Sequence, residues 1–144
     1  MSSAGAPKVP KVVVHVDGGA RGTPGPAAVG VVVSHPDGTV LDEYAELIGV
    51  ATNNVAEYQA LLRGIERAAA LGATKVEFVN DSELIAKQVN GVYKVKHPAM
   101  KPLHEEATSA LRRAFGGGWR IRSVPRAQNA RADALVNEVL DGLR

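Results

Sequence analysis

Three consecutive segments with the composition of β-strands open the chain, and they limit the folds that it can adopt. The segments are Lys11–Val16, Ala27–Ser34 and Thr39–Ile48, all rich in β-branched residues. The glycine- and proline-rich stretch Gly18–Pro26 joins the first two, and residues 35–38 (HPDG) form a turn sequence before the third. We therefore expect three neighbouring strands connected by a loop and a hairpin turn.

After residue 51 the apolar residues recur at helical spacing, and helices then alternate with strands. This order predicts an α/β fold with a mixed sheet flanked by helices, in which the first, fourth and fifth strands are parallel. The expected elements are a helix from Thr52 or Asn53 to Gly72, a strand Lys75–Val79, helices Asp81–Val89 and Pro98–Phe115, a strand Trp119–Val124 and a helix Asn129–Leu143.

The composition is that of one globular domain. The 144 residues are 45% hydrophobic, and the absence of cysteine excludes disulfides and thiolate metal sites. No apolar run approaches the ~20 residues of a membrane span, and the start lacks the apolar segment of a signal peptide. We expect a flexible lead-in over residues 1–10, one domain over residues 11–144, a monomer, no membrane contact and a cytoplasmic location.

Positive charge is concentrated in the second part of the chain. Up to Ala86 there are six Lys and Arg against ten Asp and Glu, and from Lys87 onward there are eleven against five. This asymmetry fits one region that collects cations and another that meets an anionic polymer. Ordinary scatter of surface charge accounts for it equally well.

Two aspartates come directly after expected strands. Asp17 follows the first strand and Asp81 follows the fourth, and ligands of open α/β sheets gather outside the carboxyl ends of strands. The pair is therefore a candidate site. Taken singly, Asp17 is also typical of an Asp-Gly turn, and Asp81 of a helix N-cap before Ser82.

Two further acids lie at the rims of apolar helix faces. Glu57 is roughly 80° from the centre of its helix's apolar stripe, and Asp133 lies beside Val136 and Leu140 in the last helix. Such acids are either lightly exposed surface groups or site residues that point toward the sheet. If all four carboxylates converge, they repel one another unless divalent cations bind. Oxygen ligands alone suit Mg²⁺ or Mn²⁺, and two such ions suit phosphodiester hydrolysis.

Four stretches of the sequence, in order, resemble the motifs of ribonuclease H type 1. They are residues 14–27 (VHVDGGARGTPGPA), residues 51–58 (ATNNVAEY), residues 80–82 (NDS) and residues 125–135 (PRAQNARADAL). The resemblance implies a ribonuclease H-like fold with strand order 3-2-1-4-5. It also implies an endonuclease that cleaves the RNA strand of RNA–DNA hybrids with two metal ions, leaving 3′-hydroxyl and 5′-phosphate ends.

The same resemblance assigns a metal site to the four acids. Asp17 would touch both ions, Asp133 would help to hold the ion that orients water, and Glu57 and Asp81 would help to hold the other. It further implies substrate contacts from Gly18, Gly19, Thr23, Thr52, Asn53, Asn54 and Arg126. Close backbone approach at the glycines, amide groups on the asparagines and the helix start at Thr52 suit contacts to an RNA strand and a DNA phosphate.

The chain departs from the family pattern at three places. Thr23 stands where the family usually has Asn, and Arg126 stands where many members have a His in the loop before the last Asp. Arginine cannot act as a base near neutral pH. Arg126 is therefore either a phosphate contact or a solvated charge in the loop. In place of a long basic protrusion there are only residues 91–98 and Lys101, as in a short archaeal-like branch. The candidate phosphate contacts in this region are Lys94, Lys96 and Lys101. The alternative is that they are ordinary solvent-exposed lysines.

Two other functions are compatible with these motifs. One is a non-catalytic module that binds hybrids, although four retained acids argue against it. The other is a related nuclease that also cleaves double-stranded RNA or RNA–DNA junctions, because Asn53 and Asn54 favour an RNA strand without defining its partner. A fused domain in a longer parent protein is also conceivable.

Overall fold

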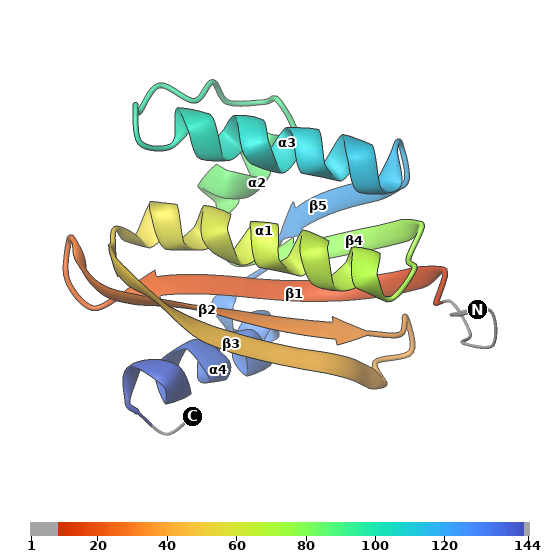
Figure 1. Cartoon of the computed structure of the whole chain (residues 1–144), viewed down its shortest axis with the longest axis horizontal. Helices are drawn as coiled ribbons and strands as arrows, with labels where there is room; N and C mark the ends of the chain where they lie inside the picture. Colours follow the sequence, from red (N-terminus) through yellow and green to blue (C-terminus); the bar gives the residue numbers. More distant parts are fainter. Residues whose placement is uncertain (1–8, 143–144) are drawn as a thin grey trace.

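The structure, a computed structural model, describes residues 9–142. Five strands form one sheet in the order β3-β2-β1-β4-β5, which confirms the order implied by the resemblance (Figure 1). The elements are β1 (Lys11–Ala20), β2 (Gly25–Ser34), β3 (Val40–Ala51), α1 (Asn53–Ala70), β4 (Lys75–Asn80), α2 (Glu83–Val89), α3 (Lys101–Phe115), β5 (Trp119–Ser123), the 3₁₀ helix η1 (Arg126–Asn129) and α4 (Ala130–Leu140).

Strand directions in the sheet follow from the connections. β1 is antiparallel to β2, and β2 is antiparallel to β3. β1 is parallel to β4, and β4 is parallel to β5, as expected for strands that helices separate. The carboxyl ends of β1, β4 and β5 therefore lie at one edge of the sheet, and their amino ends lie at the opposite edge.

β1 is longer than its valine-rich run predicts. The strand continues through Gly18 and Gly19 to Ala20, which pairs with Ala27 of β2. Asp17 is therefore inside a strand, opposite Gly30, and the connecting loop is confined to residues 21–24. The glycines predicted a loop. Small residues on both strands instead allow β1 and β2 to stay paired in the tight space beneath α1.

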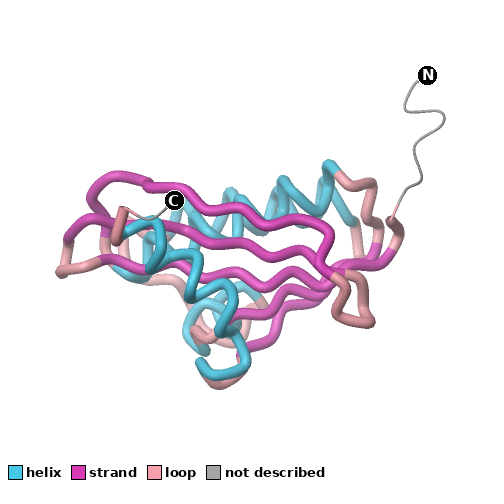
Figure 2. Tube along the Cα trace, turned by 90° about the horizontal axis from the view of Figure 1, so that it is seen from below, coloured by secondary structure: helices cyan, strands magenta, loops and turns pink. Residues whose placement is uncertain are grey.

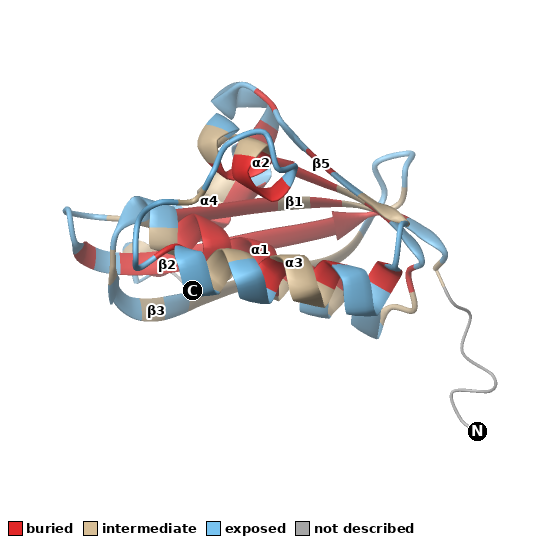
Figure 3. Ribbon diagram, turned by 90° about the horizontal axis from the view of Figure 1, so that it is seen from above, coloured by how far each residue is buried: buried red, intermediate tan, exposed pale blue. Residues whose placement is uncertain are grey.

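Helices cover the two faces of the sheet unequally. α1 and α3 lie on one face and enclose the main core, whose fully buried members include Val14, Tyr58, Leu61 and Phe78 (Figures 1 and 3). α4 packs on the other face, mainly against β1, β2 and β3, as seen in Figure 2. Gly64 lets α1 approach the sheet closely, because a Cβ there would lie 2.7 Å from the Val16 side chain.

Helix starts differ slightly from the expected boundaries. Thr52 caps α1 by accepting a hydrogen bond from the Val55 N–H (3.2 Å), as expected. Ser82, not Asp81, caps α2, which leaves the Asp81 side chain available to the site. The last helix begins at Ala130 after one 3₁₀ turn, and residue 143 of the expected helix lies outside the described residues.

The first described residues are held against the sheet. The Pro10 carbonyl accepts hydrogen bonds from the backbone N–H groups of Thr74 (3.0 Å) and Lys75 (2.9 Å), and Val9 packs against the main core. Residues 9 and 10, which we expected in a flexible lead-in, are therefore part of the fold. Residues 1–8 of that lead-in lie outside the described residues.

β3 is connected to helices on both faces of the sheet through its acidic side chains. Three ion pairs make these connections: Arg67 with Asp42, Arg63 with Glu46 (2.6 Å) and Arg131 with Glu43 (2.8 Å). Among residues 9–142, no helix is long and apolar enough to cross a membrane.

Candidate active site

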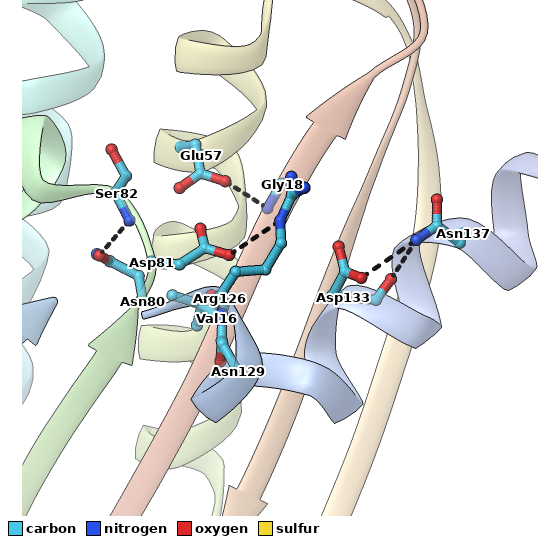
Figure 4. A network of polar contacts seen from close by, with 10 residues as sticks. All are labelled: Val16, Gly18, Glu57, Asn80, Asp81, Ser82, Arg126, Asn129, Asp133 and Asn137. Atoms are coloured by element: carbon cyan, nitrogen blue, oxygen red, sulfur yellow. Dashed lines mark hydrogen bonds and ion pairs between the residues drawn. The ribbon is translucent and has the colours of Figure 1, made fainter. Parts of the chain in front are cut away.

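Three carboxylates from separate parts of the sequence meet at the carboxyl ends of β1 and β4. Asp17 lies in β1, Glu57 in the first turns of α1, and Asp81 directly after β4. Each offers a carboxylate oxygen, and these oxygens lie within 4.8 Å of one another. Glu57 and Asp81 can be followed in Figure 4. The fold thus brings together three of the four acids that the sequence singled out.

Glu57 is positioned by a close contact between α1 and β1. Its Oε1 accepts a hydrogen bond from the Gly18 backbone N–H (2.9 Å), and the side chain is buried. A Cβ at position 18 would lie 2.1 Å from the Ala56 carbonyl oxygen, so only glycine fits there. The glycine brings the backbone of α1 close to the strand, and this approach places Glu57 beside Asp17.

Asp81 is presented by the turn between β4 and α2. The Asn80 side chain accepts a hydrogen bond from the Ser82 N–H (2.9 Å), and the Ser82 hydroxyl accepts one from Ile85 (3.2 Å). Asp81 Oδ2 is buried and makes no hydrogen bond, and the nearest cation is Arg126, whose Nε is 3.9 Å away. A buried carboxylate oxygen without a hydrogen-bond donor is free to accept one, or to bind a cation.

Asp133 lies beside this cluster without joining it. It is in the first turn of α4, is half-buried and lines the same cavity as the other three acids. The Asn137 side-chain amide donates to the Asp133 carbonyl (3.1 Å) and to its Oδ2 (3.4 Å). Arg21 donates to Asn137 Oδ1 (3.4 Å) and pairs with Asp141 (2.6 Å). These contacts connect the β1–β2 loop to the helix that carries the fourth acid.

Neither Asn129 nor Asn137 was a candidate from the sequence. The Asn129 amide donates to the Val16 carbonyl (2.9 Å) and so fixes the start of α4 to β1. The contact of Asn137 could have been predicted, because a residue four positions after Asp133 in a helix lies on the same face as Asp133. For Asn129 no local pattern predicts the contact, because its partner lies 113 positions away in the sequence.

Burial and mutual repulsion raise the pKa values of the three clustered acids. The pKa of Asp17 rises to about 7, first because burial disfavours the carboxylate and second because of the charge of Asp81. Burial and then the charge of Asp17 raise the pKa of Glu57 well above its ordinary value. Burial also raises the pKa of Asp81, against the opposing effect of Arg126. Without bound metal, carboxyl groups of this cluster therefore remain partly protonated near neutral pH.

Comparisons with known proteins agree with this geometry. The family described as reverse transcriptase-like matches residues 15–139. The crystal structure of RNase H1 from the halophilic archaeon Halobacterium salinarum has a TM-score of 0.88 and 44% identity, covering 92% of this chain and 98% of that chain. The chain belongs to the ribonuclease H1 family. The structure of LC11-RNase H1 in complex with an RNA/DNA hybrid is 42% identical, with a TM-score of 0.86, and covers 91% and 97% of the two chains.

Curated relatives of this ribonuclease H1 chain are longer than it is. It is 46% identical to the bifunctional protein Rv2228c of Mycobacterium tuberculosis over 91% of its own length, but spans 36% of that protein. It is 44% identical to ribonuclease HI of Halobacterium salinarum, again over 91% of this chain and over 65% of that protein. The domain therefore occurs within larger proteins.

Some expected substrate contacts line the cavity of this ribonuclease H1 site and others do not. The cavity is about 370 Å³ and is bordered by Gly18, Gly19, Asn53, Asn54 and Arg126 in addition to the four acids. The remaining candidates do not border it: Thr23 lies in the exposed β1–β2 loop, and Thr52 caps α1. Lys94 and Lys96 are exposed between α2 and α3, and Lys101 is the exposed first residue of α3.

Two of the lining residues already have partners within the protein. The Gly18 N–H, which we expected to face RNA, donates to Glu57 instead. Asn53 Oδ1 accepts from the Ala20 N–H (2.8 Å), so its amide nitrogen is the part that remains for a ligand. Asn54 and Gly19 are therefore the better placed of the expected contacts at this edge.

Proposed function

We propose that the chain is a divalent-metal-dependent endonuclease that hydrolyses the RNA strand of RNA–DNA hybrids. The convergence of Asp17, Glu57 and Asp81 within 4.8 Å carries this proposal, because such a cluster is poorly suited to a purely structural role. The family relationship supports it, since LC11-RNase H1, at 42% identity, has been crystallised with an RNA/DNA hybrid.

The donor set fits a hard divalent cation. Asp17, Glu57 and Asp81 offer only oxygen atoms, and Asp81 Oδ2 is buried without a hydrogen-bond donor. These three residues, together with Asp133, would hold Mg²⁺ or Mn²⁺, two ions in the substrate complex. When bound, such ions neutralise the carboxylates, lower the pKa of an attacking water and stabilise the leaving oxygen.

Residues of the chain would orient the hydrolysis. A water molecule loses a proton and its oxygen forms a bond to phosphorus. The bond from phosphorus to the 3′-oxygen breaks, and that oxygen takes up a proton. The products are then a 3′-hydroxyl and a 5′-phosphate. The Gly18 N–H keeps the Glu57 carboxylate in place, and Arg126, whose side chain is 81% exposed, can contact a neighbouring phosphate. Asn54 at the start of α1 is placed to meet a 2′-hydroxyl, the group that distinguishes RNA from DNA.

The test is cleavage of a hybrid with a labelled RNA strand. With Mg²⁺ or Mn²⁺ we expect a ladder of RNA fragments that end in 3′-hydroxyls, and Asp17→Asn should reduce the rate more than about 100-fold. Glu66→Gln is the matched control, because Glu66 is an exposed acid of the same helix as Glu57. Equal rates for Asp17→Asn and the wild type would contradict the site. Hybrid binding without cleavage across several metals would favour a non-catalytic module.

A substrate panel defines the partner of the RNA strand. Hybrid, duplex RNA, duplex DNA and a junction with ribonucleotides on one side are compared at equal concentration. The proposal expects the hybrid to be cleaved fastest and duplex DNA not at all. Duplex RNA cleaved as fast as the hybrid would contradict the proposed specificity while leaving the metal site intact.

A further inference from the structure

One wall of the cavity that holds the carboxylates is formed by a ridge of α4. Asp133, Asn137 and Asp141 are spaced four residues apart, so their side chains lie along one face of that helix. Arg21 of the β1–β2 loop meets this ridge: its guanidinium pairs with Asp141 (2.6 Å) and donates to Asn137 Oδ1 (3.4 Å). Arg21, Asn137 and Asp133 all border the cavity. Arg21 was not a candidate from the sequence.

The side-chain amide of Asn137 lies between Arg21 and the fourth acid. Its nitrogen donates to the Asp133 carbonyl (3.1 Å) and to Asp133 Oδ2 (3.4 Å), as Figure 4 shows, while its oxygen accepts from Arg21. A carboxylate only accepts hydrogen bonds, and a guanidinium only donates them. The amide between these two groups therefore has one orientation that satisfies both, with its oxygen toward Arg21 and its nitrogen toward Asp133.

The guanidinium of Arg21 also affects how strongly the amide binds Asp133. A cation at the amide oxygen polarises the group, so that its N–H becomes a better hydrogen-bond donor. Asn137 is exposed, so without Arg21 water can meet either end of the amide. An amide turned by half a rotation would present its oxygen to the carboxylate, and two acceptors repel. Arg21 therefore favours the orientation that holds Asp133.

The backbone that carries Arg21 is fixed on both sides. The Arg21 N–H donates to the Pro26 carbonyl (2.8 Å) and so closes the β1–β2 loop. The N–H of the preceding residue, Ala20, donates to Asn53 Oδ1 at the start of α1 (2.8 Å). The Arg21 side chain therefore starts from a fixed point, which allows it to hold an exposed amide in one orientation.

We propose that Arg21 is a positioning residue of the metal site, which acts on Asp133 through the amide of Asn137. This inference rests on the proposed nuclease function, in which Asp133 helps to hold a divalent cation. Hydrogen bonds behind a metal-binding carboxylate fix its orientation, and their loss weakens metal binding and catalysis. In this role Arg21 touches neither the ions nor the substrate.

Two simpler roles for Arg21 make different predictions. As a phosphate contact, Arg21 would have to leave both Asp141 and Asn137, and its loss would raise the KM for the hybrid and reduce the salt dependence of binding. As a clamp between the loop and α4, Arg21 would act mainly through the shorter contact with Asp141, so loss of Asp141 would have the same effect as loss of Arg21.

Cleavage kinetics separate these roles. Arg21→Met keeps the apolar stem and removes the guanidinium, and kcat on the hybrid should fall about two- to threefold with KM unchanged, the low end for one hydrogen bond. In an Asn137→Ala background the same change should lower kcat no further, because the amide is gone. Asp141→Asn is the control: it removes the ion pair, leaves the contact of Arg21 with Asn137 and should keep the wild-type kcat.

The orientation of the amide can be measured without metal or substrate. In a two-dimensional amide NMR spectrum, the side-chain signals of Asn137 are identified by their loss in Asn137→Ala. Arg21→Met should move these signals toward those of solvent-exposed asparagines, and Asp141→Asn should leave them near their wild-type positions. Titration with Mg²⁺ in the same spectra should show about two- to threefold weaker binding for Arg21→Met. Thermal unfolding checks that each variant is folded.

Three results would overturn the proposal. The first is Arg21→Met with unchanged Asn137 amide signals. The second is a raised KM with an unchanged kcat, which indicates a phosphate contact. The third is an equal loss of kcat in Asp141→Asn, or a loss that persists in the Asn137→Ala background, which indicates a clamp. If the wild type cleaves no hybrid, the proposed nuclease function fails, whereas the amide spectra still decide whether Arg21 orients Asn137.

Discussion

Each edge of the parallel strands places like-charged side chains next to one another, but the two edges bury these side chains to different degrees. At the carboxyl edge, Asp17 and Glu57 are only 6% and 8% exposed, and Glu57 is held by a backbone hydrogen bond. At the amino edge, Lys11 and Lys75 are exposed to water, which screens their repulsion. Burial makes the acidic edge costly in the absence of a bound cation, whereas the basic edge costs little.

The largest expected effect is at the glycine that brings α1 to the acidic edge. Gly18→Ala places a methyl group 2.1 Å from the Ala56 carbonyl oxygen, so helix and strand must separate. We expect the free energy of unfolding to fall by about 4 kcal/mol or more, with loss of hybrid cleavage. Denaturant unfolding measures the first effect. Gly117→Ala is the control, because a Cβ there meets nothing within 4 Å.

The second effect is a pH dependence of stability that only the acidic edge should show. Because folding raises the pKa of Asp17 from 3.8 to about 7, the contribution of Asp17 to the stability of the metal-free protein is fully present below about pH 4 and is lost as the pH rises to about 7. The expected loss is on the order of 4 kcal/mol. Denaturant midpoints across this range measure it. Asp17→Asn should flatten the profile, and an unchanged slope would contradict the assigned cause.

Binding of a divalent cation should reverse that pH dependence. Mg²⁺ or Mn²⁺ binds the ionised carboxylates, so the stabilisation it gives should increase as the pH rises through about 7. Thermal unfolding with metal and with EDTA at pH 5 and pH 8 measures the difference. At pH 8, metal should raise the unfolding temperature of Asp17→Asn less than that of the wild type. A metal effect that is equal at both pH values would argue against binding at these acids.

A smaller effect is expected at Asn137, which holds the fourth acid. Asn137→Ala removes the amide that donates to Asp133 Oδ2, and one hydrogen bond of about 1 kcal/mol corresponds to a roughly fivefold lower cleavage rate. The rate constant should fall while the KM for the hybrid is unchanged. Asp141→Asn is the control, since it removes the exposed pair with Arg21 without touching Asp133.

The smallest effect is at the basic edge. Lys75→Gln removes the repulsion with Lys11 and should stabilise the protein by a few tenths of a kcal/mol at low ionic strength, but not at 1 M salt. Denaturant unfolding at the two salt concentrations measures it. Lys94→Gln, at an exposed loop lysine, should show no such difference. A stabilisation that persists at high salt would indicate a cause other than charge.

The sequence predicted the elements that have a strong period, and the resemblance supplied the strand order. Alternation and helical spacing report which face of an element is apolar, and this determines the packing of α1 and the position of Glu57 near the sheet. The extension of β1 through Gly18 and Gly19 was missed, because glycines are typical of loops and the reason for a glycine at position 18 is the distant Ala56 carbonyl.

The fine geometry of the site depends on contacts that no local pattern encodes. Tyr58 donates to the buried Gln88 side chain (2.7 Å), and Asn129 donates to the Val16 carbonyl; each pair is formed by segments far apart in the sequence. The cations at the amino edge of the parallel strands were also not predicted as neighbours. Lys11, Lys75 and Arg120 come from β1, β4 and β5, and they come together only when the sheet is assembled.

The ion pairs of β3 have a consequence for self-association. β3 is an edge strand, and its unpaired backbone groups could recruit a strand from another molecule. Charged side chains that Arg63, Arg67 and Arg131 hold over both faces, together with the bend at Gly49 (φ +86°), make a flat intermolecular ladder unfavourable. High ionic strength, which weakens these pairs, is therefore the condition in which aggregation through this strand should first be seen.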